Sequence, residues 1–176
     1  DKFMAPELAA GAHISTQKFG AAGLRGLTTI TYPSIHETMS IDTDLAVKAI
    51  LEEKPRICYV GQSVYLFPND LKPIVEAAKE VGASTMYDGA HVLGLIAGKQ
   101  FQDPLSDGMD LITASTHKTF PGPQHGVILG NHDVELPNGK SLHKTIRSRV
   151  FPGVHSNHHL HKVAAFGVSL AEALEF

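Results

Sequence analysis

The chain has 176 residues, of which 43% are hydrophobic and 19% charged, and its formal net charge is −3. This composition is typical of one globular domain, and without a basic cluster it does not favour a nucleic-acid partner. The single cysteine excludes an internal disulfide and favours a reducing, cytoplasmic location. No apolar run approaches the ~20 residues that span a bilayer, so no membrane partner is expected.

Helices and strands are predicted to alternate along the chain. A loop comes first, and the elements that follow in chain order are a helix (15–24), a strand (28–32), a helix (43–54), a strand (56–63), a helix (69–81), three strands (84–91, 110–115, 125–130) and two helices (142–149, 158–174). Short buried strands that alternate with helices favour an α/β fold with a largely parallel sheet.

Three polar residues lie at or just beyond the ends of predicted strands: Ser63, Asp88 and Lys118. In open α/β sheets, functional groups gather where the strands end at their carboxyl side. The three residues come from different strands. They are therefore candidates to converge on one pocket.

Lys118 is the most distinctive of these candidates. It lies beside His117 among several hydroxyl residues and between two apolar runs, where a buried ammonium group would be costly. Burial favours the neutral amine, which can attack a carbonyl and form a Schiff base. Enzymes that use pyridoxal phosphate (PLP) combine such a lysine with an acid on the ring nitrogen, a role open to Asp88. The structural alternatives are that Lys118 is a surface lysine, that Asp88 caps a turn and that His91 is a core histidine.

Five ordered stretches carry a resemblance to a known family: GAHIS (11–15), GQSVY (61–65), YDGAHVLGLIAG (87–98), STHKTFPGPQHGVILG (115–130) and RVFPGVHSNHHLHKVAAFGVSLAEAL (149–174). Together they resemble the serine hydroxymethyltransferases. The resemblance implies the large domain of a fold type I PLP-dependent transferase, with a mainly parallel sheet flanked by helices. It also implies that residues 1–176 form the central part of that domain, without its N-terminal segment and without the C-terminal small domain.

The resemblance also implies a role for each matching residue. Lys118 matches the lysine that forms the Schiff base with PLP, and Asp88 matches the acid on the pyridine nitrogen. His91 and Ser63 match groups near the phenolic oxygen of the ring. His13 matches the histidine that stacks on the ring face, a contact suited to a flat aromatic cofactor.

Further implied roles concern the residues beside the lysine and a later loop. Thr116 and His117 match residues that influence proton transfer, and Gly153 matches a loop that approaches the neighbouring subunit's cofactor phosphate in the family's homodimer. The implied reaction is retro-aldol cleavage of serine to glycine. A reduced pterin, either tetrahydrofolate or tetrahydromethanopterin, would accept the one-carbon unit.

Departures from the commonest family pattern leave alternatives open. Phe120-Pro121 stands in place of Leu-Arg, Gln124 in place of Arg, and Ser-Asn-His-His at 156–159 in place of a Gly-Gly-Pro loop. These changes resemble archaeal-type members, or the related threonine aldolases and transaldolases, which act on threonine. An inactive fragment is a second alternative. A third is a metal-binding module, because imidazole suits Zn or Ni and four histidines lie close together at His155, His158, His159 and His161.

Overall fold

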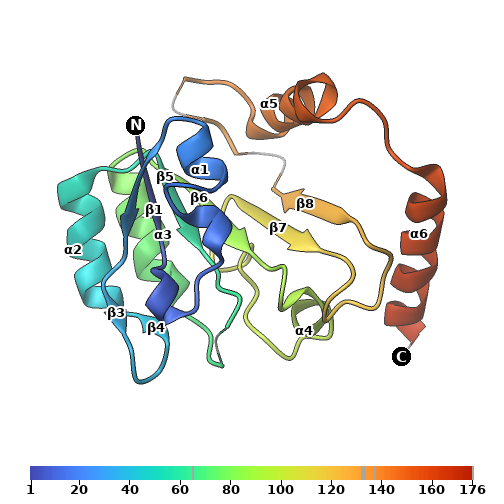
Figure 1. Cartoon of the computed structure of the whole chain (residues 1–176), viewed down its shortest axis with the longest axis horizontal. Coiled ribbons are helices and arrows are strands. Elements are labelled where there is room, and N and C mark those ends of the chain that lie inside the picture. The colour runs from blue at the N-terminus through green and yellow to red at the C-terminus, as the bar shows by residue number, and fades with distance from the viewer. Residues whose placement is uncertain (65, 132–133, 137, 176) are drawn as a thin grey trace. The chain divides into compact units, whose positions relative to one another are not determined.

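The computed structural model describes residues 1–64, 66–131, 134–136 and 138–175 (Figure 1). Its strands β1 (Lys2–Ala5), β2 (Thr28–Thr31), β5 (Ile57–Val60), β6 (Ser84–Asp88), β7 (Leu111–Ser115) and β8 (Gly126–Gly130) form one sheet in the order β2-β1-β5-β6-β7-β8. The first four pair in parallel, which confirms the predicted α/β fold. The chain divides into two compact units, residues 1–88 with 102–112 and residues 89–101 with 113–176, and each is described by itself.

In the first unit, β1 lies between β2 and β5 and pairs in parallel with both. The sequence prediction of a loop over these residues is wrong. Three of the four residues of β1 are buried, so the strand shows no alternation of apolar and polar residues that would indicate it. Phe3, Ala5, Ala22 and Tyr59 form a small core cluster on this strand and its neighbours.

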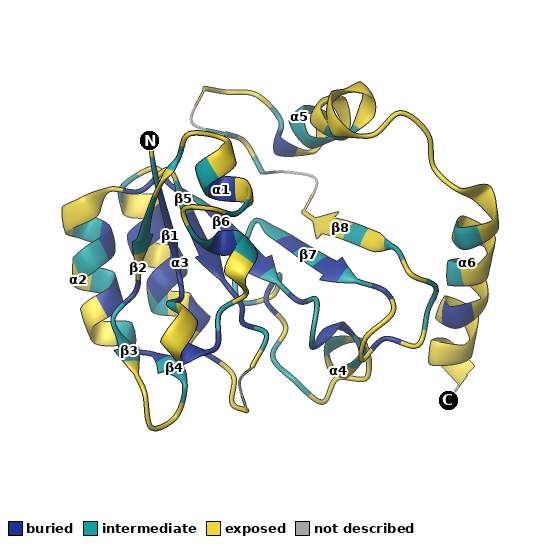
Figure 2. Cartoon of the chain, in the orientation of Figure 1, coloured by how far each residue is buried: buried dark blue, intermediate teal, exposed yellow. Residues whose placement is uncertain are grey.

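The predicted helices 43–54 and 69–81 are confirmed as α2 (Thr43–Glu53) and α3 (Leu71–Glu80). The Asp42 side chain caps α2 by accepting from the Leu45 N–H at 3.1 Å. The two helices pack against each other, and α3 also packs against β5 and β6. In Figure 2 the buried residues of this unit follow the strands and the inner side of these helices.

The prediction of one helix over 15–24 is wrong in its extent. Two short 3-10 helices, η1 (Leu8–Ala10) and η2 (Ile14–Thr16), are followed by the four-residue α1 (Ala21–Leu24). Gly20 has an extended backbone and separates η2 from α1. Two short strands, β3 (Ser34–Ile35) and β4 (Ser40–Ile41), form an antiparallel hairpin that was not predicted.

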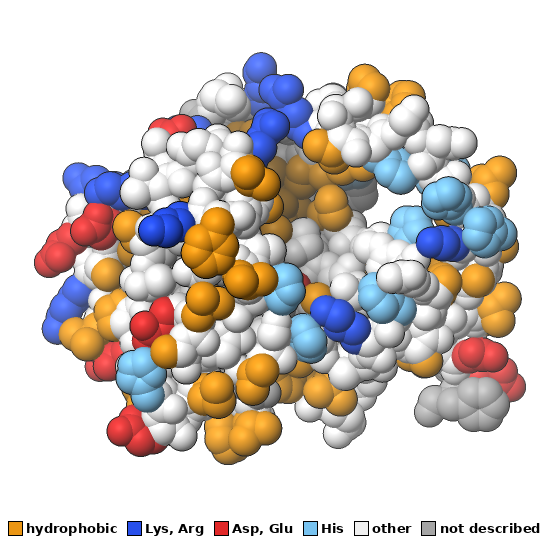
Figure 3. Space-filling view, viewed as in Figure 1, with side chains coloured by type: hydrophobic (Ala, Val, Ile, Leu, Met, Phe, Trp, Pro, Cys, Tyr) orange, Lys and Arg blue, Asp and Glu red, His pale blue; other side chains and the backbone are white. Residues whose placement is uncertain are grey.

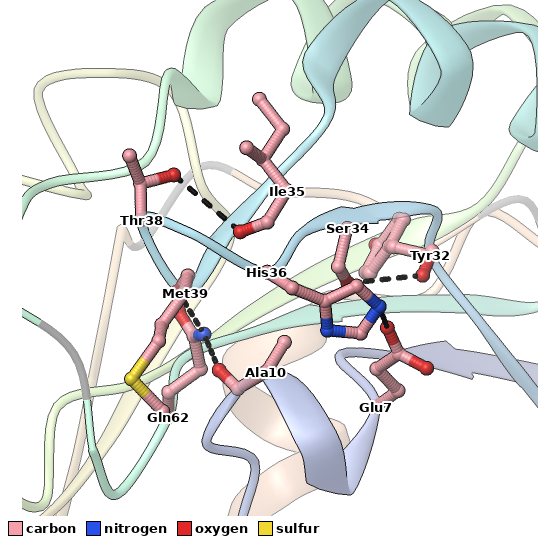
Figure 4. Close-up of polar contacts among 9 residues, drawn as sticks. All are labelled: Glu7, Ala10, Tyr32, Ser34, Ile35, His36, Thr38, Met39 and Gln62. Atoms are coloured by element: carbon pink, nitrogen blue, oxygen red, sulfur yellow. Dashed lines mark hydrogen bonds and ion pairs between the residues drawn. The ribbon is translucent and has the colours of Figure 1, made fainter.

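Buried amide side chains hold the loop between β5 and α3. Gln62 is 3% exposed, and its Nε2 donates to the carbonyl oxygens of Ala10 and Met39, the latter at 2.7 Å (Figure 4). The Asn69 Nδ2 donates to the Gln62 Oε1 at 3.0 Å, and the Asn69 Oδ1 accepts from the Ile41 N–H at 3.0 Å. Both ends of the loop are therefore fixed by hydrogen bonds that water does not reach.

Asn69→Ala is expected to lower the free energy of unfolding by about 3 kcal/mol, because it leaves a buried N–H and a buried amide oxygen without partners. Urea unfolding measures this change. Thr38→Ala is the control, since the Thr38 hydroxyl donates to the Ile35 carbonyl on the exposed hairpin (Figure 4), and it should change stability by less than about 0.5 kcal/mol. Equal losses in the two variants would contradict the role of the buried network.

Cys58 and Tyr32 are a buried pair of titratable groups in the same unit. Burial raises the pKa of Cys58 to about 12, while Tyr32 beside it acts weakly in the opposite direction. Burial also raises the pKa of the Tyr32 phenol well above its usual value, and the nearby Cys58 raises it further. Both groups therefore stay protonated in the folded chain at pH values where they ionise in the unfolded chain.

This difference predicts a loss of stability in alkaline solution. The stabilising contribution of Cys58 is complete below the unfolded pKa of 9.0, and it is lost as the pH rises toward the folded value of about 12, in total by about 4 kcal/mol. Urea unfolding at several pH values between these limits measures the slope. In Cys58→Ala the slope should be shallower, with the part due to Tyr32 remaining. Identical slopes would contradict the prediction.

The second unit holds α4 (Leu93–Ala97), most of β7, β8, α5 (Leu142–Ser148), the kinked turn η3 (Arg149–Val154) and α6 (Leu160–Glu175). The predicted helices 142–149 and 158–174 are thus confirmed within two residues. Phe166 of α6 contacts Phe120 edge to face at 5.6 Å, and the Ser169 hydroxyl donates to the Pro121 carbonyl at 3.1 Å. Much of α6 is exposed (Figure 2). Of the helices in the described ranges, none is long and apolar enough to cross a membrane.

Candidate functional site

Asp88 is the last residue of β6, and it is held from the neighbouring strand. The Tyr59 hydroxyl of β5 donates a hydrogen bond to the Asp88 Oδ2. The Tyr59 ring is 6% exposed and packs against Phe3 with ring centroids 5.5 Å apart. Because packing fixes the ring, the phenol holds one carboxylate oxygen in place, while the residue as a whole stays partly accessible.

Gly61 allows the backbone that follows β5 to lie close to Asp88. Its φ is +126°, and a Cβ at this position would lie 2.8 Å from both the Cβ and the N of Asp88. Real Cβ atoms do not approach other atoms so closely, and the backbone angle is one that side chains other than glycine rarely adopt. The glycine therefore allows the backbone that follows β5 to lie directly against the acid.

Ser63 lies two residues further along the same loop. Its N–H donates to the Gly11 carbonyl at 2.8 Å, and the Val64 N–H donates to the same oxygen at 3.1 Å. The Ser63 Oγ is buried and has no hydrogen-bond partner among the described residues. A buried hydroxyl without a partner is uncommon and is available to a ligand oxygen or nitrogen. Tyr65, the last residue of the GQSVY motif, lies outside the described residues.

His13 is the N-cap of η2 in the same unit. Its Nδ1 accepts from the Ser15 N–H at 3.2 Å and lies 2.8 Å from the Ser15 hydroxyl. The ring is exposed. Its orientation is therefore fixed through one nitrogen, and its face remains accessible.

In the second unit, Lys118 lies beside His91. The Lys118 Nζ and the His91 Nε2 are 3.1 Å apart. Lys118 is exposed, so the expectation of a buried lysine is wrong, because β7 ends at Ser115 and the lysine lies in the loop beyond it. The structure thus pairs the lysine with an imidazole rather than enclosing it in an apolar environment.

The pairing depends on how α4 meets the loop after β7. The Gly94 N–H donates to the Thr119 Oγ1 at 3.2 Å. A Cβ at Gly94 would lie 2.5 Å from the Thr119 carbonyl carbon and 2.8 Å from the Phe120 nitrogen. The glycine therefore lets the first turn of α4, which begins two residues after His91, lie against the backbone next to Lys118.

The other predicted site residues of this unit differ in their surroundings. Thr116 is 1% exposed, and its hydroxyl donates to the carbonyls of Pro123 and His125 at 2.6 and 3.1 Å, so it holds the turn between β7 and β8. His117 is exposed next to Lys118. Gly153 lies in the exposed turn η3, where an added Cβ would make only an ordinary contact with the Ser148 carbonyl at 3.7 Å.

The structure therefore describes two sets of residues. The first unit holds Asp88 and the loop with Ser63, and the second holds the Lys118–His91 pair. Sequence reasoning did not identify Tyr59, Gly61 or Gly94 as part of either set. For Tyr59 a signal existed, since a tyrosine near the end of β5 faces the neighbouring parallel strand that ends on an acid.

The histidine-rich segment after η3 does not assemble a metal site in the structure. The rings of His159 and His161 lie 5.6 Å apart. Within the part of the chain that the structure describes, no group of three or more His, Cys, Asp or Glu side chains could hold a metal ion. The metal-binding alternative therefore gains no support from the geometry.

The mainly parallel α/β sheet, with an acid at the end of one strand and a lysine in the loop after another, has the architecture of the fold type I large domain. Comparison with known proteins names the family. The model of the family "Serine hydroxymethyltransferase" matches residues 1–176, and the chain belongs to this family. This confirms the resemblance carried by the five motifs.

Individual relatives agree with the family match. The chain is 56% identical to a serine hydroxymethyltransferase of Thermoplasma acidophilum, 53% to one of Picrophilus torridus and 54% to one of Methanothermobacter marburgensis. Each match covers all 176 residues of the chain and 39–40% of the relative. The chain thus spans about 40% of the length of these relatives.

Proposed function

We propose that the chain carries the PLP-binding core of a serine hydroxymethyltransferase, which cleaves serine to glycine and transfers the one-carbon unit to a reduced pterin. The observation that supports this most directly is the 3.1 Å distance between the Lys118 Nζ and the His91 Nε2. A lysine that attacks a carbonyl must first release a proton, and an adjacent imidazole nitrogen can accept it. A surface lysine without such a task needs no imidazole beside it.

The residues around Asp88 fit the cofactor as well. PLP, when bound, supplies an electron sink that stabilises negative charge at the α-carbon of the substrate. Asp88, oriented by Tyr59, would hold the proton on the pyridine nitrogen, since a carboxylate stabilises a nearby cation. The buried Ser63 Oγ without a partner offers a hydrogen bond to a polar atom of the ring. The exposed His13 ring offers a stacking surface.

The remaining assignments follow from the family. We assign His117 and Thr116 to positioning the loop of Lys118 and to the proton transfers beside it. Gly153 belongs to the turn proposed to approach a cofactor phosphate across a homodimer. The amino-acid substrate would be serine or glycine, and the acceptor tetrahydrofolate or tetrahydromethanopterin. A cytoplasmic location fits this function.

The test is covalent capture of PLP on Lys118. The purified chain is mixed with PLP, treated with borohydride and digested, and the labelled peptide is identified by mass spectrometry. We expect a stable label on the peptide containing Lys118, and complete loss of that label in Lys118→Ala. Lys99→Ala, which removes an exposed lysine of the same unit, should be labelled like the wild-type chain.

Two outcomes would decide against the proposal. A label distributed over several lysines, or one that persists in Lys118→Ala, would mean that Lys118 is not the cofactor lysine. Serine cleavage that proceeds equally well without any pterin, with threonine as the better substrate, would instead indicate an aldolase of the same fold.

A further inference from the structure

A cavity of about 450 Å³ lies along α5 and the start of η3. It is lined by three cationic side chains, three hydroxyls and one amide: Lys140, Lys144, Arg149, Ser141, Thr145, Ser148 and Asn138. Figure 3 shows Lys and Arg side chains gathered where α5 begins in Figure 1. We refer to it as the α5 cavity.

The α5 cavity follows one face of the helix. Ser141, Lys144, Thr145 and Ser148 are spaced three and four residues apart, so their side chains lie in a row along α5. Leu142 lies on another face and is buried. The helix therefore directs its apolar side inward and a continuous polar, cationic side to the cavity.

A short turn before α5 forms the other wall of the α5 cavity. The Leu136 N–H donates to the Lys140 carbonyl at 2.8 Å, and the Lys140 N–H donates to the Asn138 Oδ1 at 3.1 Å. Gly139 has a φ of +73°, which the turn requires. A backbone bridge between Glu135 and Ser141 closes the turn onto the start of α5. Lys140 is thereby held beside the helix face by the backbone itself.

The chemistry of the lining favours a negatively charged ligand. No carboxylate is among the lining residues, and within the described ranges none of the three cations forms a salt bridge. Most ligand pockets are lined mainly by apolar side chains, whereas every lining residue here is polar or charged. All three cationic side chains are exposed, so an anion can reach them from solvent.

We propose that the α5 cavity binds a small, multiply charged anion through phosphate or carboxylate groups. Lysine ammonium groups and an arginine guanidinium bind both groups through charge-assisted hydrogen bonds. The Ser141 and Thr145 hydroxyls can donate to further oxygens, whereas the Ser148 hydroxyl already donates to the Thr145 carbonyl. The volume is within the range of small-molecule sites, about 300–1,000 Å³, so the ligand is a small polyanion rather than a single monovalent ion. Arg149 begins η3, the turn that also holds Gly153, so one end of the cavity adjoins a residue assigned above to the cofactor.

Calorimetric titration of the whole chain tests the proposal, with pyrophosphate and citrate as probes at constant ionic strength. We expect saturable binding of one ion per chain for at least one probe. In the double variant Lys144→Gln/Arg149→Gln the Kd should rise by roughly tenfold or more, because two charge-assisted contacts are lost. Arg147→Gln is the matched control, since Arg147 is exposed on the same helix but does not line the cavity, and its Kd should stay within about twofold.

The two probes distinguish a phosphate ligand from a polycarboxylate ligand. Tighter binding of pyrophosphate, lost in the double variant, would identify a phosphate ligand, and the same pattern for citrate would identify a polycarboxylate. The proposal is overturned if neither probe saturates a site, or if the control loses as much affinity as the double variant. It is also overturned if pyrophosphate binds the double variant as tightly as the wild-type chain, since that ion would then occupy another site, such as the one proposed for the cofactor. Circular dichroism of each variant checks that the fold is retained.

Discussion

On the proposed function, Asp88→Asn is expected to reduce the rate of serine cleavage by at least ~1000-fold, which corresponds to about 4 kcal/mol of lost transition-state stabilisation. Asparagine has nearly the same shape, and its Oδ1 can still accept the hydrogen bond from Tyr59. It has no negative charge, however, and cannot hold the proton on a pyridine nitrogen. Capture of PLP on Lys118 should therefore persist while turnover is lost. The measurement is steady-state kinetics beside borohydride labelling of the same preparations.

Two further variants separate the charge of Asp88 from its position. Asp88→Glu keeps the charge and should retain more activity than Asp88→Asn. Tyr59→Phe removes only the hydroxyl that orients the carboxylate, and we expect a loss of roughly tenfold in kcat with labelling of Lys118 unchanged. If Asp88→Asn turned over serine at the wild-type rate, the role assigned to the carboxylate would be wrong.

The sequence predicted those parts of the fold that carry strong local signals. Helix α2 has an N-cap at Asp42 and regular apolar spacing, and it was predicted to within one residue. Strand β1 has neither feature. Three of its four residues are buried between two neighbouring strands, and this tertiary cause leaves no local pattern. In the region 15–24, a glycine with an extended backbone interrupts the helix that the composition favoured.

For the site, the sequence identified residues but not their surroundings. Asp88 and Lys118 were recognisable because each follows a buried strand and each matches a family motif. Tyr59 contacts Asp88 only through the register of two parallel strands 29 residues apart in sequence, which a motif does not show. Likewise, the exposure of Lys118 follows from where β7 ends, and the apolar runs on either side of the lysine suggested the opposite.

Gly61→Ala is expected to lower the free energy of unfolding by about 3–5 kcal/mol and to displace the Asp88 side chain. Two costs combine at this residue. The backbone angle of +126° is strained for alanine, and the new Cβ would lie 2.8 Å from the Cβ and the N of Asp88. Because backbone rather than a flexible side chain is in the way, either β5 or β6 must shift. Urea unfolding measures the stability, and serine turnover measures the effect on the acid.

Gly82→Ala separates these two costs. Gly82 lies in the same unit with a φ of +72°, and nothing lies within 4 Å of the position its Cβ would take. Its variant should therefore lose only about 1 kcal/mol, the cost of the left-handed backbone alone, and should keep full turnover. The excess loss in Gly61→Ala then measures the close approach to Asp88 together with the greater backbone strain at +126°. If both variants lost the same stability, the contact between Gly61 and Asp88 would not restrict residue 61, and the position of the acid would depend on Tyr59 alone.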